Sequence, residues 1–280
     1  MDFKITNDAV NRGIEYIMRH LEDEISIDDV ARHCNISKYH FSRVFRSQTG
    51  QSMYGFIKRL KMDQSALKLK IEKKKSITDI GLDYGYSSSN YSSAFKKHHA
   101  ISPLEFRRLV NTSCVEHPFF EDVKASFLSF EEYDKEIRIE DLGDFPVIYE
   151  RNIGNYIELG KKWCEFTEKY KEYLKEDTLL IERSYDDPSI TDLDQCLYDI
   201  CMTVEGNCPL ENITTIEGGK FAVYRFSGSI PGIFTAFQGI FNVWLPDSGF
   251  QMDERYGLGI YRALDAEKMH VVMDLCIPVK

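Results

Sequence analysis

The sequence lacks any long hydrophobic run. No apolar stretch approaches the roughly 20 residues that a helix needs to span a bilayer. The amino terminus, MDFKITNDAV, has no basic segment followed by an apolar one, which is the pattern of a secretory signal. We therefore expect a cytoplasmic protein that has no membrane as a partner.

Short cysteine pairs are also missing. The seven cysteines are an odd number and are scattered, which favours reduced thiols. Cys196, Cys201 and Cys208 lie closest together, but their spacings do not match the short pairs of zinc sites and no histidine lies nearby. Only His117 and His270 lie in the carboxyl-terminal part, and no serine nucleophile with a histidine base is visible there. We expect no metal, no cofactor and no enzymatic activity.

Positive charge is scarce overall but not at the amino-terminal end. The 280-residue chain has 35 Lys and Arg against 45 Asp and Glu, a net charge of −10. Residues 1–113 contain 19 basic and 13 acidic residues, a net charge of +6. Residues 114–280 contain the remaining 16 basic and 32 acidic residues, a net charge of −16. A basic first part and an acidic remainder indicate a DNA-binding domain joined to a domain that stays off DNA.

What the chain does contain is one segment twice. Residues 25–56 align without a gap with residues 75–106 after a shift of 50 residues. Phe45 then meets Phe95, and most other apolar positions also meet apolar ones. A repeat of this size is typical of one supersecondary unit used twice.

Each copy is predicted to form two helices joined by a tight turn. Asn35 and Gly85 tolerate the left-handed backbone of a sharp helix exit, and Ser37 and Ser87 are favoured caps for the second helix. A second helix with a polar and basic outer face completes the helix-turn-helix arrangement. The outer faces are predicted to contact DNA through Lys38, Tyr39, Ser42, Arg43, Arg46, Ser89, Asn90, Ser93, Lys96 and Lys97.

These side chains are expected to have different roles. Arg43 is the best base reader, because a guanidinium can bond both acceptors of guanine. Asn90 can pair with an adenine edge or, alternatively, cap the start of its helix. Arg46, Lys96 and Lys97 are expected to bind phosphates.

The segment between the copies, residues 52–71, has the apolar period of a helix. A helix of about 20 residues spans about 30 Å, close to one turn of DNA. A rigid linker of this length would place two recognition helices in successive major grooves. Its polar face, either solvated or in contact with phosphates, carries Lys58, Arg59, Lys61, Lys68 and Lys70.

From residue 137 the pattern changes to short strands rich in β-branched and aromatic residues, interrupted by two helical stretches. The order strand-helix-strand-strand occurs twice, which predicts an antiparallel sheet with helices on one face, an α+β domain. The expected organisation is an all-α domain at 1–111 with helix-turn-helix units at about 24–50 and 74–100, a linker at 112–135, and the α+β domain at 136–280.

The amino-terminal part resembles the AraC/XylS family of bacterial transcription regulators. The resemblance covers about residues 8–111 and rests on Gly-Tyr-Ser at the second turn, Tyr-Ser before Phe-Lys-Lys, and the Ser-Pro and Phe-Arg that follow. This chain departs from the family at Ser93, where an Arg is usual, at Ala100, where a Gly is usual, and in a turn one residue shorter. The resemblance implies double-stranded DNA and RNA polymerase as partners, with base reading by the first motif.

Residues 136–280 resemble the GyrI-like, or multidrug-effector-binding, domain. The resemblance rests on Tyr198-Asp199, a Gly-Gly-Lys-Phe-Ala-Val-Tyr segment, Trp244–Gly249 and a terminal Ile-Pro-Val. Such domains bind small, often cationic or aromatic, ligands between the two repeats, and many have a Glu on a late strand in the pocket. Gly259 stands on that strand here, and the nearest remaining acid is Asp274.

Aromatic residues of this part are candidates for ligand contacts, because ligand sites are mostly apolar and aromatic faces attract cations. Packing of the core is the alternative for most of them. The candidates, with one acid, are Tyr149, Tyr156, Trp163, Tyr198, Tyr224, Phe226, Tyr256, Tyr261 and Asp274.

The function predicted is a sequence-specific DNA-binding transcription regulator whose carboxyl-terminal domain senses a small aromatic or cationic molecule. Two alternatives stay open. The carboxyl-terminal domain could bind a protein partner, or it could have a residual hydrolase activity of the kind that uses a pocket carboxylate. Gly259 argues against the hydrolase.

Overall fold

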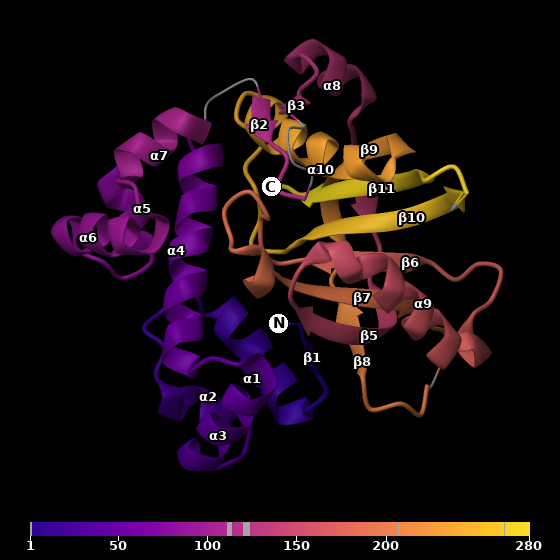
Figure 1. Ribbon diagram of the computed structural model, residues 1–280, viewed down its shortest axis with the longest axis horizontal. Coiled ribbons are helices and arrows are strands. Elements are labelled where there is room, and N and C mark those ends of the chain that lie inside the picture. The colour runs from indigo at the N-terminus through magenta and orange to yellow at the C-terminus, as the bar shows by residue number, and fades with distance from the viewer. Residues whose placement is uncertain (1, 111–113, 120–123, 207, 266) are drawn as a thin grey trace. The chain divides into compact units, whose positions relative to one another are not determined.

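The computed structural model describes residues 2–110, 114–119, 124–206, 208–265 and 267–280 (Figure 1). The chain divides into two compact units, an N-terminal unit (Met1–Thr112) and a C-terminal unit (Ser113–Lys280). The predicted fold class is confirmed, because the first unit is helical and the second is built on an antiparallel sheet. Among the described residues, no helix combines the length and apolarity needed to cross a membrane.

The N-terminal unit consists of seven α-helices after a short strand. Asn7 caps the first helix by accepting a hydrogen bond from the Val10 amide at 3.2 Å. The elements are β1 (Phe3–Ile5), α1 (Asp8–Arg19), α2 (Ile27–His33), α3 (Lys38–Thr49), α4 (Met53–Ile71), α5 (Ile77–Asp83), α6 (Ser88–His99) and α7 (Pro103–Val110).

The 50-residue repeat recurs at each helix boundary. Helices α2 and α3 begin and end 50 residues before α5 and α6, and Ser37 and Ser87 occupy the two N-cap positions. Asn35 and Gly85 have the predicted positive φ, 57° and 79°, at the two turns. The structure therefore contains two copies of one helix-turn-helix motif.

Each motif has its own aromatic core of the same design. Phe45 packs against Phe56 with ring centroids 5.3 Å apart in the first copy, and Phe95 packs against Phe106 at 5.5 Å in the second. All four rings are buried. Because burial of an aromatic ring contributes several kcal/mol, each motif holds its recognition helix rigidly.

Helix α4 runs from the group α1–α3 to the group α5–α7, as Figure 1 shows for this unit. Two of its lysines bond both groups instead of facing solvent or DNA. Lys61 Nζ donates to the Asp23 carbonyl at 3.0 Å and to the Tyr84 carbonyl at 3.2 Å. Lys68 contacts Glu22 and, at 3.3 Å, Asp83. The two motifs are thus braced against a common rod.

The C-terminal unit is built mainly from the strands that the sequence predicts. Its sheet has the order β5-β7-β6-β10-β11-β9-β4, and β8 pairs with β5 on the outside; every pair is antiparallel. The strands are β4 (Arg138–Leu142), β5 (Phe145–Ile153), β6 (Leu180–Ser184), β7 (Leu197–Thr203), β8 (Ile213–Ile216), β9 (Gly219–Ser229), β10 (Gly257–Asp265) and β11 (His270–Pro278).

The two predicted helical stretches are present but interrupted. The first consists of a 3-10 turn η1 (Tyr156–Glu158), α9 (Leu159–Lys169) and a second turn η2 (Lys171–Tyr173). The second is α10 (Ile230–Gly239), which continues as a π-helical turn η4 (Ile240–Trp244).

The sequence predicts a linker over 112–135, whereas the described part of this segment has regular structure. Strands β2 (Cys114–Glu116) and β3 (Lys124–Ser126) pair with each other, and α8 spans Phe130–Glu136. Within the C-terminal unit, Trp244 Nε1 donates to Asp134 of α8 at 2.9 Å. Helix α8 is therefore part of the folded domain.

Candidate DNA-binding surface and ligand site

Helix α3 buries one side and exposes the other. Phe41 and Phe45 face the core and are fully buried. On the outer side Tyr39 is 87% exposed, and Arg43 is also exposed. Four of the five predicted DNA-contacting side chains of α3 are exposed on this outer surface: Lys38, Tyr39, Arg43 and Arg46. The fifth, Ser42, is half-buried.

Two of these side chains already have partners within the motif. Lys38 Nζ forms an ion pair with Asp28 at 2.6 Å, which raises the pKa of Lys38 and compensates its charge. Arg43 Nη2 lies 3.4 Å from His40 Nδ1, a weak contact that leaves the guanidinium available to a base. Among the described residues, no carboxylate forms an ion pair with Arg46. The net positive charge of this face therefore lies at Arg43 and Arg46.

Helix α6 exposes a less basic surface. Ser93 occupies the position equivalent to Arg43, and cations begin only in the last turns. Asn90 is exposed, while Ser87 holds the N-cap position, so Asn90 is not the helix cap. The predicted contacts of this helix all lie on its exposed surface: Ser89, Asn90, Ser93, Lys96 and Lys97.

In the C-terminal unit, strand register places side chains from six strands in rows across the sheet. Directly paired residues lie on the same face, and neighbours along a strand alternate between faces. One row carries the two buried acids Glu150 and Glu182, with Gly259 next to Glu182. The full row is Glu150, Ile200, Glu182, Gly259, Leu275 and Tyr224.

Helices α9 and α10 both lie on this face. Trp163 of α9 donates a hydrogen bond to Glu182 at 3.0 Å, and Tyr170, which directly follows α9, donates one to Glu150 at 3.1 Å. Gly232 of α10 lies against the Phe226 ring, two residues along β9 from the row. We call this the helix-covered face.

Glu182 is the acid at the centre of the helix-covered face. Its carboxylate accepts hydrogen bonds from Trp163 Nε1 and from the Tyr261 hydroxyl. Burial raises the pKa of Glu182, and the two hydrogen bonds offset part of that rise. No cation pairs with Glu182 among the described residues, whereas Glu150 in the same row binds Lys169 at 2.8 Å. Glu182 is therefore a buried carboxylate that two aromatic side chains contact.

The expectation that Asp274 is the nearest acid to Gly259 is wrong. Glu182 pairs directly with Gly259 across β6 and β10. Asp274 pairs with Ile260 and so points to the opposite face, where Arg225 and Arg262 contact it. Sequence reasoning missed Glu182, which stands in the strand LLIERSY. The alternation of that strand shows which side chains share a face with Glu182, but the register of β6 against β10 is set only by the tertiary structure.

The other predicted ligand contacts divide between several places. Tyr156 stacks on Tyr198 at 4.5 Å, one row along from Glu182, while Trp163 and Tyr261 meet edge to face at 5.5 Å. Tyr224 and Phe226 lie at the α10 end of the same face.

Two further candidates lie away from Glu182. Tyr149 points to the opposite face and packs in the core with Cys201 and Val223. Tyr256 packs against Tyr185 at 4.6 Å. The structure thus brings four of the predicted aromatic residues to one acid: Tyr156, Trp163, Tyr198 and Tyr261.

Comparison with protein families gives two matches. Residues 135–280 match the GyrI-like small molecule binding domain, and residues 30–109 match a helix-turn-helix domain. The first match covers 280 − 135 + 1 = 146 residues, just over half of the 280-residue chain.

Individual relatives match between about a third and two fifths of the chain. The Right origin-binding protein of Escherichia coli (strain K12) is 34% identical over 90 residues, which are 32% of this chain and 31% of that protein. The probable transcription factor PqrA of Proteus vulgaris is 31% identical over 106 residues, 37% of this chain and 86% of that protein. The solved C-terminal domain of AraT, a response regulator from Geobacillus stearothermophilus, is 28% identical, with a TM-score of 0.35 and coverage of 37% and 86%. The chain spans about a third of the length of several curated relatives that it matches, the Right origin-binding protein among them.

Proposed function

This chain belongs to the GyrI-like small-molecule-binding family and carries an AraC-type helix-turn-helix domain, and we propose that it regulates transcription in response to a small cationic, aromatic molecule. The N-terminal unit would bind double-stranded DNA, and RNA polymerase would be its partner at the promoter. The C-terminal unit would bind the effector on its helix-covered face.

The observation that supports DNA binding is the pair of recognition helices on one rod. Helix α4 has 19 residues, so it is about 28 Å long, close to the spacing of successive major grooves. Because α3 carries Arg43 and α6 has Ser93 at the equivalent place, the first motif would specify sequence and the second would chiefly bind phosphates through Lys96 and Lys97.

A pair of substitutions tests this division of roles. Arg43→Ala should lower specific DNA affinity by about 1–3 kcal/mol and relax base preference, because a bidentate base contact is lost. Ser93→Ala should cost much less. Selection of bound sequences, followed by titration of the selected site at fixed salt, measures both. Equal losses for the two variants would contradict base reading by the first motif alone.

Effector binding is supported by one feature, the uncompensated acid Glu182 beside Trp163 and Tyr261. This buried carboxylate has no cation partner among the described residues, whereas Glu150 in the same row pairs with Lys169. A ligand with a quaternary ammonium and a flat apolar body would supply the missing charge and pack against the rings.

Glu182→Gln is the test of this site. A panel of hydrophobic cations should raise the melting temperature of the wild-type chain, and Glu182→Gln should remove that rise while leaving any response to neutral analogues. Glu150→Gln is the matched control, because its carboxylate is already paired with Lys169. A panel without any shift, or equal effects of the two substitutions, would count against a cation sensor.

Two further measurements, enzymatic turnover and protein binding, separate the two alternative functions. The named relatives are regulators or DNA-binding proteins, but a carboxylate at Glu182 removes the argument from Gly259 against a hydrolase. Turnover of a reactive ester or other electrophile, lost in Glu182→Gln, would favour the enzyme. Binding of a protein partner without any small-molecule response would favour the third class.

A route from ligand to the rest of the chain starts at Phe119. This residue precedes the sheet and lies between the two halves of the helix-covered face: its ring is 6.1 Å from Tyr156 and 6.0 Å from Phe234 of α10. His117 Nε2 donates to the Pro231 carbonyl at 3.0 Å and anchors the same segment. A ligand that moves Tyr156 would therefore move the segment that follows the DNA-binding unit.

A further inference from the structure

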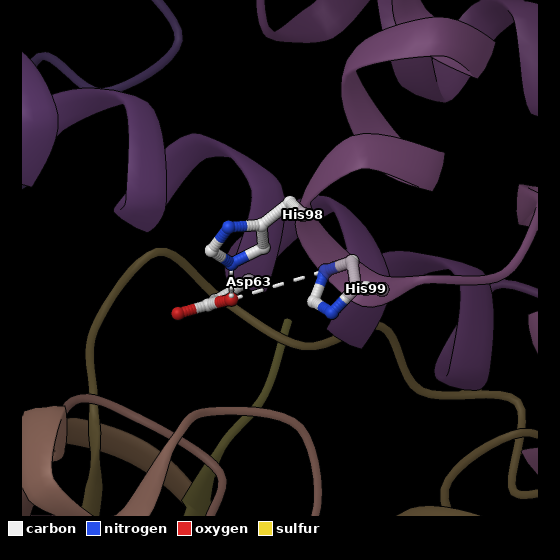
Figure 2. Close-up of side chains that lie close together, drawn as sticks. All are labelled: Asp63, His98 and His99. Atoms are coloured by element: carbon white, nitrogen blue, oxygen red, sulfur yellow. Dashed lines mark hydrogen bonds and ion pairs between the residues drawn. The ribbon is translucent and has the colours of Figure 1, made fainter.

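Three metal-ligating side chains meet in the N-terminal unit, at the junction of α4 and α6. Figure 2 shows Asp63 of α4 with His98 and His99, the last two residues of α6. His98 Nε2 lies 2.7 Å from Asp63 Oδ1, and His99 Nε2 lies 3.8 Å from the same oxygen. One ligand atom from each of the three side chains falls within 4.8 Å of the others.

The local fold aims these groups at one point. Arg59, one helical turn before Asp63, donates to Asp63 Oδ2 at 3.1 Å and so leaves Oδ1 turned towards the histidines. Ala100 adopts φ 65° and ends α6 directly after His99. The His99 ring packs on Phe95 with centroids 4.4 Å apart, which fixes its plane. These contacts hold the three ligand atoms together without a ligand.

We propose that Asp63, His98 and His99 bind a divalent transition-metal ion, for which Zn²⁺ is the best match. Two imidazole nitrogens and one carboxylate oxygen are a ligand set that suits Zn²⁺ and its neighbours in the series, and three protein ligands leave a fourth position for water. This site is separate from the proposed effector site and does not depend on it.

The two distances to Asp63 need only a small adjustment. Zinc bonds of about 2.0–2.1 Å at tetrahedral angles put ligand atoms about 3.3 Å apart. His98 would move away from Asp63 by roughly half an ångström, and His99 would move closer by a similar amount. The metal would take the place of the proton that His98 and Asp63 now share.

Electrostatics decides how tightly such a site binds. Burial lowers the pKa of the His99 imidazole, and a metal ligand must be an unprotonated imidazole nitrogen. The His98 side chain is 32% exposed and gives the ion a path from solvent. Arg59 acts against a dication by its charge, but it also fixes the carboxylate, as outer hydrogen bonds to ligating carboxylates do.

The site has a structural consequence because its ligands come from two helices. Asp63 lies in the middle of the rod α4, and the two histidines end the recognition helix of the second motif. A bound metal would tie α6 to α4 and stabilise the N-terminal unit.

Cobalt titration of the full chain tests the proposal. Chelator-treated protein, in a Cys164→Ser background that removes an exposed thiol, should bind one Co²⁺ with visible d–d absorption, and Zn²⁺ should displace it. His98→Gln and His99→Gln should each weaken binding at least about tenfold. His40→Gln, which removes an exposed histidine of α3, is the matched control and should leave binding unchanged.

Paramagnetic shifts in the wild-type protein provide a second measurement that does not rely on folding of a variant. Co²⁺ should shift the imidazole resonances of His98 and His99 and spare those of His40. No binding at about 100 µM Co²⁺, far above the affinity expected of three protein ligands, would overturn the proposal. So would unchanged affinity in both histidine variants, or shifts that fall on other histidines.

Discussion

At the scale of single residues, the most constrained group is a row of charges across β5, β7 and β6. Asp199 is fully buried and accepts two hydrogen bonds from Arg151, at 2.8 and 2.9 Å, and two from Arg183, at 2.6 and 3.2 Å. The Tyr185 hydroxyl donates to the same carboxylate at 2.7 Å. Burial alone would raise the pKa of Asp199, but the two guanidiniums hold it below its ordinary value.

Asp199→Asn should therefore destabilise the C-terminal unit by about 3–5 kcal/mol, because two buried guanidiniums lose their counter-charge. The effect depends on pH with a definite sign. A lowered native pKa stabilises the fold above the ordinary Asp range and is lost as pH falls through the native value. Urea unfolding across pH should show a large difference at pH 7 that shrinks in acid.

Asp274→Asn is the matched control for this substitution. Asp274 is also buried and paired with two arginines, but Arg225 and Arg262 are 47% and 37% exposed and can be solvated. Asp274→Asn should therefore lower the free energy of unfolding by less than Asp199→Asn does. Equal losses at the two positions would show that burial of the arginines does not determine the cost.

Residue identity alone did not reveal which acid lies at the centre of the helix-covered face. LLIERSY and YGLGIY both alternate as strands do, and Glu182 and Gly259 each could be assigned a face within their own strand. Which residue stands beside which depends on the register of β6 against β10, which sequence-distant strands set only on folding. The strand and helix patterns, by contrast, place most of the candidate aromatic residues on one face.

At the scale of elements, the repeat made the N-terminal helices predictable. Ser37 caps α3 by accepting a hydrogen bond from the His40 amide, and Ser87 holds the same position of α6 without such a bond. Asn35 and Gly85 adopt the left-handed conformation at the two turns. The C-terminal additions were less visible: α8 lies in an acidic segment with no apolar period, and it forms because Tyr133 is buried against Tyr224 at 5.6 Å. Ser129 and Glu132 also form a capping box at the start of α8, a local signal that the sequence contains. Tertiary packing supplies the rest of the stability of such a short helix.

The two recognition helices end in the same left-handed conformation with different residues. Gly50 ends α3 at φ 73°, and Ala100 ends α6 at φ 65°. Ala100→Gly should stabilise the chain by about 0.5–1 kcal/mol, because relief of a left-handed alanine, about 1–2 kcal/mol, exceeds the added freedom of glycine in the unfolded chain. Thermal unfolding followed by circular dichroism measures the gain.

The reverse change at the equivalent position supplies the control. A Cβ on Gly50 would lie 2.6 Å from the Phe3 ring, so Gly50→Ala adds a clash to the backbone strain and should cost about 1–3 kcal/mol. A neutral or destabilising Ala100→Gly would mean that α6 does not end as described.

At the scale of the whole molecule, the chain joins parts with opposite charge and different structure. The net charge is +6 for residues 1–113 and −16 for the remainder, by the count of Lys, Arg, Asp and Glu. The first part is suited to a polyanion and the second to a cation. One ligand for each part is the simplest arrangement that uses both charges.

The two tryptophans of the chain, Trp163 and Trp244, both lie in the C-terminal unit, whereas most of the α-helix lies in α1–α7. Tryptophan fluorescence should therefore follow unfolding of the C-terminal unit, and circular dichroism at 222 nm should follow mainly the N-terminal unit. We expect two separable transitions. A hydrophobic cation at about 100 times its Kd should raise the fluorescence midpoint by roughly 5–10 °C, and specific DNA should raise the other.

Two variants test this assignment. Glu182→Gln should remove the shift that the cation causes in the fluorescence midpoint, and Arg43→Ala should reduce the shift that DNA causes in the other midpoint. Each variant should leave the other shift unchanged. A cation that moved both midpoints equally in the wild type would mean that the units unfold as one and that binding energy is shared between them. In that case the effector would act on DNA binding through common stability. Separate shifts would instead require a specific contact, such as the segment at Phe119, to carry the signal.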